Sequence, residues 1–167
     1  MTSAGKSVFV SDDEAEPITL SMLPGAEFQR IWSADETAQL PTDGSEPSAE
    51  GYFPGEGGFR FGFFSVPPAG TRPPADLDLA AAMAEMNEKL PGMMNVMEPD
   101  NPGMHRTDTV DYIVVLSGEV SLELDDGETV HLSAGDCVVQ NGTRHAWRNT
   151  SSATCVMAVA LVGAHRK

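Results

Sequence analysis

From residue 110 to residue 163 the chain is a series of short apolar runs separated by turn residues, and this rhythm constrains the fold more than any other feature. An Asp126-Gly127 pair lies between two alternating stretches, which is typical of a β-hairpin. Regularly spaced short strands of this kind predict an antiparallel sandwich or barrel. The expected strands are 110–118, a hairpin over 119–133, 135–140, 141–149 and 154–163.

The first half of the chain is less regular. Residues 34–58 are rich in Pro, Gly and acidic residues and predict a long loop between strands. Because the stretches before and after this loop are apolar, they are expected to be strands as well. These additional strands are expected at 6–11, 27–33 and 59–68.

One helix is expected, over residues 76–90. Leu79, Met83, Met86 and Leu90 recur at helical spacing there, and the run closes with a Pro-Gly pair. The segment that follows, 91–104, is rich in methionine and turn residues. The helix and this segment either cover one side of the core or form a lid over a pocket.

Charge and composition exclude several classes of partner. The chain has 25 Asp and Glu against 10 Lys and Arg, a formal charge of −15, which argues against nucleic acid or an anionic membrane surface as a partner. No apolar segment approaches the roughly 20 residues of a membrane-spanning helix, and no signal peptide is recognisable. Cys137 and Cys155 lie in apolar strand-like runs, where buried free thiols and a cytoplasmic location are expected.

Polar side chains recur with one parity at two places in the strand region. Residues of equal parity point to the same face of a strand. If both segments line one barrel interior, two imidazoles, a carboxylate, an indole and an amide meet in one cavity. The inward candidates are His105, Thr107, Asp111, His145, Trp147 and Asn149.

The stretch 103–149 resembles the two motifs of the cupin superfamily, whose members are double-stranded β-helix, or jelly-roll, barrels. The motif G-x5-H-x-H-x3/4-E-x6-G is matched by His105, Thr107, Asp111 and Gly118. The motif G-x5-P-x-G-x2-H-x3-N is matched by Gly135, Gly142, His145 and Asn149, with one residue fewer between the glycines and Asn141 in place of proline. The resemblance implies a mainly β, single cupin barrel with an N-terminal extension and one helix.

The resemblance also implies a metal site, in altered form. Thr107 stands where a metal-binding cupin has its second histidine, and Asp111 stands for glutamate. The remaining set of His105, Asp111 and His145 is the ligand combination of non-haem Fe(II) oxygenases and of some zinc sites. A divalent Fe, Zn, Ni or Mn ion is therefore expected. The alternative is a metal-free pocket in which one of the histidines acts as a general base.

These features predict an enzyme that acts on a small molecule. A polar cluster between apolar walls favours a carbonyl-containing, partly apolar metabolite and lyase, dehydratase or isomerase chemistry. A non-haem Fe(II) dioxygenase, or a cupin that binds a ligand without converting it, is the alternative. The expected catalytic residues are His145, His105 and Asp111. The expected substrate-binding residues are Thr107, Trp147, Asn149 and Tyr112.

The expected organisation is one domain in three parts. Residues 1–75 would pack N-terminal strands and a loop on the barrel, 76–104 would lie near its mouth, and 105–163 would form its core. By resemblance, the protein is expected to be a homodimer. The residues expected on the surface or rim are His131, His165, Arg106, Arg144 and Arg148.

Overall fold

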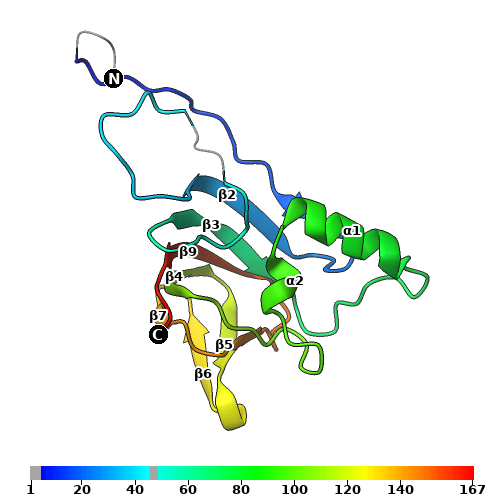
Figure 1. Cartoon of the computed structure of the whole chain (residues 1–167). Coiled ribbons are helices and arrows are strands. Elements are labelled where there is room, and N and C mark those ends of the chain that lie inside the picture. Colours follow the sequence, from blue (N-terminus) through cyan, green and yellow to red (C-terminus); the bar gives the residue numbers. More distant parts are fainter. Residues whose placement is uncertain (1–4, 46–48) are drawn as a thin grey trace.

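The computed structural model describes residues 5–45 and 49–167, which form two antiparallel sheets and two short helices (Figure 1). The strands are β1 (Ile18–Thr19), β2 (Glu27–Ala34), β3 (Phe59–Val66), β4 (Thr109–Ser117), β5 (Glu119–Glu123), β6 (Thr129–Ser133), β7 (Cys137–Asn141), β8 (Ala146–Arg148) and β9 (Cys155–Gly163). The helices are α1 (Leu79–Lys89) and α2 (Met93–Val96), with a 3-10 turn at Asp125–Gly127.

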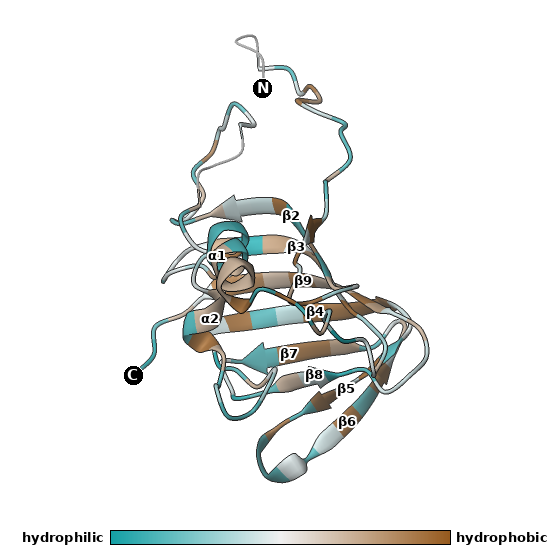
Figure 2. Cartoon of the chain, turned by 90° about the vertical axis from the view of Figure 1, so that its right-hand side faces the viewer, coloured by the Kyte–Doolittle hydropathy of each residue, from teal (hydrophilic) through white to brown (hydrophobic). Residues whose placement is uncertain are grey.

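The larger sheet joins the two halves of the chain. Its strand order is β1-β2-β3-β9-β4-β7, and the smaller sheet has the order β6-β5-β8 (Figure 2). β3 pairs along its whole length with β9, from Phe59 opposite Val162 to Val66 opposite Cys155. The N-terminal strands are therefore part of the barrel sheet itself, hydrogen-bonded to the last strand, rather than a layer packed upon it.

The inner face of the larger sheet has two covers. Over β4 and β9 the smaller sheet closes the core; its buried apolar members are Ile113, Val115, Val120, Leu122, Leu132, Cys155, Met157, Val159 and Leu161. Over β1 and β2 the helices cover the sheet, and a second buried cluster of Leu20, Met86, Leu90 and Met93 lies there. Phe53 packs against both clusters and joins them.

The predicted helix forms at the predicted place. Asp78 caps α1, and its carboxylate accepts hydrogen bonds from the backbone N–H groups of Ala80 and Ala81. Met86 and Leu90 are buried as the helical spacing predicts, but Leu79 is 67% exposed because it opens the helix, away from the cluster. A second, shorter helix, α2, lies within the segment that was expected to be a loop.

Two other expectations are wrong. Residues 6–11 form no strand: they extend away from the sheets (Figure 1), with Val8, Phe9 and Val10 exposed, because no neighbouring strand pairs with them. Cys137 is a free thiol as expected but is exposed, because it lies on the outer face of β7; Cys155 is both free and buried.

Candidate functional site

The two histidines of the motifs lie directly opposite each other. The backbone N–H of His105 donates to the carbonyl oxygen of His145 at 2.9 Å, and the backbone N–H of His145 donates to that of His105 at 2.9 Å. This reciprocal pair fixes the two backbones as an isolated antiparallel bridge just before β4 and β8. The ring centroids are consequently 4.2 Å apart, with the planes tilted by 50°.

Each imidazole is oriented by a carbonyl group two residues earlier in the chain. Nδ1 of His105 lies 3.0 Å from the carbonyl oxygen of Gly103, and Nδ1 of His145 lies 3.0 Å from that of Thr143. Because a carbonyl oxygen only accepts hydrogen bonds, Nδ1 carries the proton in both rings. Both Nε2 atoms therefore keep a lone pair for a ligand or a proton.

Burial keeps this pair uncharged. His145 is only 2% exposed, and the loss of hydration, together with the charge that His105 can carry, lowers the pKa of His145 to about 4. Burial also lowers the pKa of the half-buried His105, against the opposing effect of its bond to Gly103. Both imidazoles are neutral at pH 7, the form in which nitrogen acts as base or ligand.

Asp111 lies inside the barrel as its parity predicts. It stands on β4 with 4% exposure, and its Oδ1 has no hydrogen-bond partner among the described residues. Burial raises the pKa of Asp111 to about 6, and the hydroxyl of Thr109 opposes the shift. Thr107 is buried as well, but its hydroxyl is hydrogen-bonded to that of Thr109 at 2.7 Å.

The donor set does not form the expected three-ligand metal centre. In the described part of the chain, no three His, Cys, Asp or Glu side chains lie close enough together to hold a metal ion. His105 and His145 supply two adjacent nitrogen donors, but Asp111 does not complete a set with them. The described residues therefore show only this pair of nitrogen donors, and binding of Fe, Zn, Ni or Mn stays a prediction.

An apolar wall adjoins the imidazole pair. The half-buried ring of Trp147 meets His145 edge-on, with centroids 5.9 Å apart and planes at 85°. On its other side Trp147 contacts Phe64 of β3 at 6.1 Å. Trp147 therefore lies beside the histidines, and its predicted role in substrate binding stays a prediction.

Two predicted substrate-binding residues need correction. Tyr112 is 52% exposed, because alternation along β4 turns it to the outer face, opposite to Asp111. Asn149 is buried, but its amide is fully used within the chain: it donates to the carbonyl oxygens of Val66 and Ala153 and accepts from the N–H and hydroxyl of Ser151. Asn149 therefore holds a turn in place and has no group left for a ligand.

The remaining histidines and arginines lie where the sequence places them. His131 and His165 are exposed, beside Glu119 and Glu56. Arg106 is exposed, and the two half-exposed arginines form ion pairs at the rim. Arg144 contacts Glu98 and Asp125, and Arg148 contacts Glu123.

Sequence reasoning missed two polar residues of the interior, Arg30 and Tyr52. Arg30 lies at the end of a bulge in β2, and its Cζ is 5.6 Å from the centre of the Tyr52 ring. Burial raises the pKa of the Tyr52 hydroxyl far above its usual value. The usable signal was an arginine within an apolar strand-like run, but alternation alone gives no hint of the bulge.

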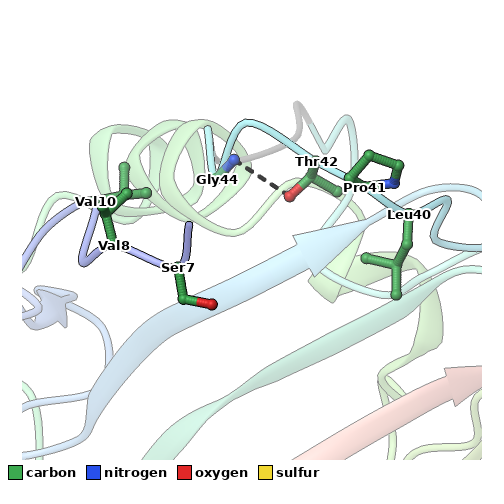
Figure 3. A pocket seen from close by; sticks show the side chains of 7 residues that line it. All are labelled: Ser7, Val8, Val10, Leu40, Pro41, Thr42 and Gly44. Atoms are coloured by element: carbon green, nitrogen blue, oxygen red, sulfur yellow. Dashed lines mark hydrogen bonds between the residues drawn. The ribbon is translucent and has the colours of Figure 1, made fainter. Parts of the chain in front are cut away.

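A hollow in another part of the chain has different lining residues. It has a volume of about 560 Å³ and is formed where residues 7–10 pass the loop at 40–44 (Figure 3). None of its seven lining residues is titratable: they are Ser7, Val8, Val10, Leu40, Pro41, Thr42 and Gly44. None of the predicted site residues lines it, so it is not the expected catalytic pocket.

Comparison with known proteins agrees with the barrel geometry. A family model described as "Cupin domain" matches residues 93–162, the range that contains the histidine pair and Asp111. The chain contains a cupin domain. The resemblance to the cupin superfamily, and the mainly β fold that it implies, are thereby confirmed.

Curated relatives match over part of the chain. Phomopsin biosynthesis cluster protein C' of Diaporthe leptostromiformis is 58% identical over 48 residues, which are 29% of this chain and 25% of the relative. The cupin-domain-containing oxidoreductase virC of Hypocrea virens is 42% identical over 55 residues, 33% of this chain and 26% of the relative. The chain thus matches only about a quarter of the length of these relatives.

Solved cupin structures are similar at low sequence identity. The polyketide cyclase RemF of Streptomyces resistomycificus has a TM-score of 0.47 and 19% identity, over 93% of this chain and 78% of that one. In the described residues, no helix is long and apolar enough to cross a membrane.

Proposed function

We propose that this cupin-domain protein is an enzyme that acts on a carbonyl-containing, partly apolar small molecule by proton transfer through the His105–His145 pair. One observation carries the proposal: two neutral imidazoles are in contact inside the barrel, and each has its Nδ1 proton engaged by a backbone carbonyl. Their Nε2 atoms are therefore available as bases in a fixed orientation.

The chemistry follows from the charge balance. A proton leaves the carbon next to the substrate carbonyl for an Nε2 atom, and the electron pair of the broken C–H bond becomes an enolate. The same proton then leaves with a β-hydroxyl group as water, which is dehydration, or returns to another carbon, which is isomerisation. Because burial disfavours imidazolium, the pair holds the proton only briefly.

The surroundings support this substrate class. Trp147 and Phe64 give the pair an apolar, aromatic wall, which suits a ring-containing ligand. The relatives from Diaporthe leptostromiformis are named for a biosynthesis cluster, which supports a small-molecule metabolite as substrate. The homodimer and the cytoplasmic location predicted from the sequence remain part of this proposal.

The test uses a β-hydroxy ketone that carries a phenyl group on its β-carbon, the aldol adduct of benzaldehyde and acetone, whose dehydration gives a conjugated product that absorbs in the ultraviolet. Wild-type protein should accelerate dehydration, and His145→Gln or His105→Gln should lower the rate by roughly 100-fold or more. His131→Gln, which changes an exposed histidine of β6, is the matched control and should keep the wild-type rate. A wild-type rate in His145→Gln would remove the basis of the proposal.

A second candidate is an oxidoreductase. It is favoured by the relative from Hypocrea virens, which carries that name, and by the two adjacent nitrogen donors. Elemental analysis of protein purified without chelator, combined with an oxygen electrode, separates the candidates. Bound iron with substrate-dependent oxygen consumption supports the oxidoreductase, whereas turnover that survives chelator treatment supports proton transfer.

A further inference from the structure

Arg30 lies on the inner face of β2, directly before a bulge. In the pairing of β2 with β3, Arg30 lies opposite Gly62 and Trp32 lies opposite Phe61, so Ile31 is one residue in excess. The two backbones approach so closely here that a Cβ at Gly62 would overlap the carbonyl oxygen of Gln29. Bulges of this kind redirect side chains and are frequent beside active sites. Here Trp32 lies on the outer face and Arg30 on the inner one.

Arg30 reaches the interior without a partner for its charge. Its guanidinium stacks near the Tyr52 ring, but Nε and Nη2 are buried and have no hydrogen-bond acceptor among the described residues. Arginine stays protonated at any physiological pH, so this half-buried side chain carries a positive charge while two of its donor nitrogens have no acceptor among the described residues. Such a charge destabilises a folded protein unless a ligand completes it.

Arg60, a neighbouring arginine on the inner face of the sheet, has partners for its charge and its donors in the described part of the chain, unlike Arg30. Arg60 of β3 forms an ion pair with Asp35. It also donates to the carbonyl oxygens of Ala34 and Gly51, at 2.9 Å and 3.1 Å. The fold therefore satisfies Arg60 completely and leaves the donors of Arg30 open, two strand positions away on the same sheet.

Asp111 also has an unpartnered atom among the described residues, but it lies away from Arg30 on the same sheet. Arg30 stands on β2 and Asp111 on β4, with β3 and β9 between them. Oδ1 of Asp111 is buried without a donor, as Nε and Nη2 of Arg30 are buried without an acceptor. The two groups are therefore separate, and an anionic oxygen group of a ligand would satisfy Arg30.

We infer that Arg30 binds a carboxylate of the substrate inside the barrel, with the Tyr52 ring against the substrate's apolar part. The planar guanidinium fork matches a carboxylate bidentately. The inference rests on the proposed function only in taking the barrel interior as the ligand site. It narrows the substrate to carboxylate-bearing aromatic carbonyl compounds.

Binding of benzoate, compared with its neutral isostere benzamide, tests the inference without any turnover. Wild-type protein titrated by ligand-observed NMR at about pH 7 should prefer benzoate by roughly tenfold or more. Arg30→Met should abolish the preference, and Arg30→Lys should keep part of it, because charge remains but the fork is lost. Arg72→Met, at an exposed arginine outside the barrel, should bind as wild type does. Equal binding of both probes by wild type, or an unchanged preference in Arg30→Met, overturns the inference.

Thermal unfolding separates ligand binding from a structural role. Because Arg30 is unpaired, Arg30→Met should have a Tm equal to or above that of wild type, whereas Arg60→Met should lose stability. A fall in Tm for Arg30→Met as large as that for Arg60→Met overturns the inference.

Benzoate binding should also persist in His145→Gln. Arg30-dependent binding without dehydration activity contradicts the proposed function alone, and activity without Arg30-dependent binding contradicts this inference alone.

Discussion

At the residue scale, burial favours the uncharged forms of both His145 and Asp111, but it moves their pKa values in opposite directions. The pKa of His145 falls to about 4, and that of Asp111 rises to about 6. Near pH 7 the imidazoles are therefore neutral, while the carboxyl group is largely ionised inside a barrel whose described residues offer its Oδ1 no donor. The ionisation of Asp111 near neutral pH therefore costs the folded protein stability.

Asp111 gives a prediction about stability and pH. Its folded pKa of about 6 lies above the ordinary 3.8, so the folded state binds the proton more tightly. The resulting stability is full below pH 3.8 and is lost as the pH rises through 6. In chelator-treated protein, Asp111→Asn should match wild type at about pH 4 and exceed its free energy of unfolding by up to about 3 kcal/mol at about pH 7.5. Urea unfolding at both pH values measures this, and an equal difference at both would contradict it.

Individual residues also show which side-chain orientations could be predicted from the sequence. Alternation correctly placed Asp111 inside, because β4 is regular at that position; Thr107 and His145 are buried as well, although they lie just before β4 and β8. The same rule applied to β4 turns Tyr112 outward, which the site prediction did not respect. Arg30 follows the alternation from Phe28, but the excess residue of the bulge turns Trp32 to the other face, which alternation could not predict.

At the scale of elements, α1 depends on one capping residue. Asp78 satisfies two backbone N–H groups at the start of the helix, which has no other acidic residue in its first turn. Asp78→Ala should therefore lower the free energy of unfolding by about 1 kcal/mol in a denaturant titration. Asp76→Ala removes an exposed carboxylate just outside the helix and should change stability much less. Equal losses in the two variants would argue against the cap.

The elements that were predicted well are those with a long local period. The helix over 76–90 and the strands from 109 onward were located from spacing alone. Residues 6–11 alternate like a strand but lack a partner, and pairing is a property of the whole fold that a local pattern does not contain. β1 and α2, of two and four residues, are too short to show any period.

At the scale of the whole molecule, the outer face of the larger sheet is unusually apolar. Side chains on it are 37–56% exposed across three adjacent strands; they include Tyr112, Val114 and Leu116 of β4, Val139 of β7 and Val162 of β9. An exposed apolar face on an acidic protein is where the proposed homodimer would form, sheet against sheet.

The dimer has a matched test. Val139→Lys, on this face, should convert the protein to a monomer in light scattering coupled to size exclusion, because it buries a charge in the interface. Val130→Lys is the control: Val130 is equally exposed, at 57% against 56% for Val139, but it belongs to the smaller sheet. A monomeric wild type, or dissociation by both variants, would refute sheet-against-sheet pairing.

The positions of the two thiols make the native protein easy to label. Cys155 is wholly buried, so a maleimide dye or a nitroxide spin probe reacts at Cys137 alone. Cys137 lies beside Val114 on the apolar outer face of the sheet. A single reporter therefore sits on the surface in question without mutagenesis, and a probe-to-probe spectroscopic distance would map how two subunits meet.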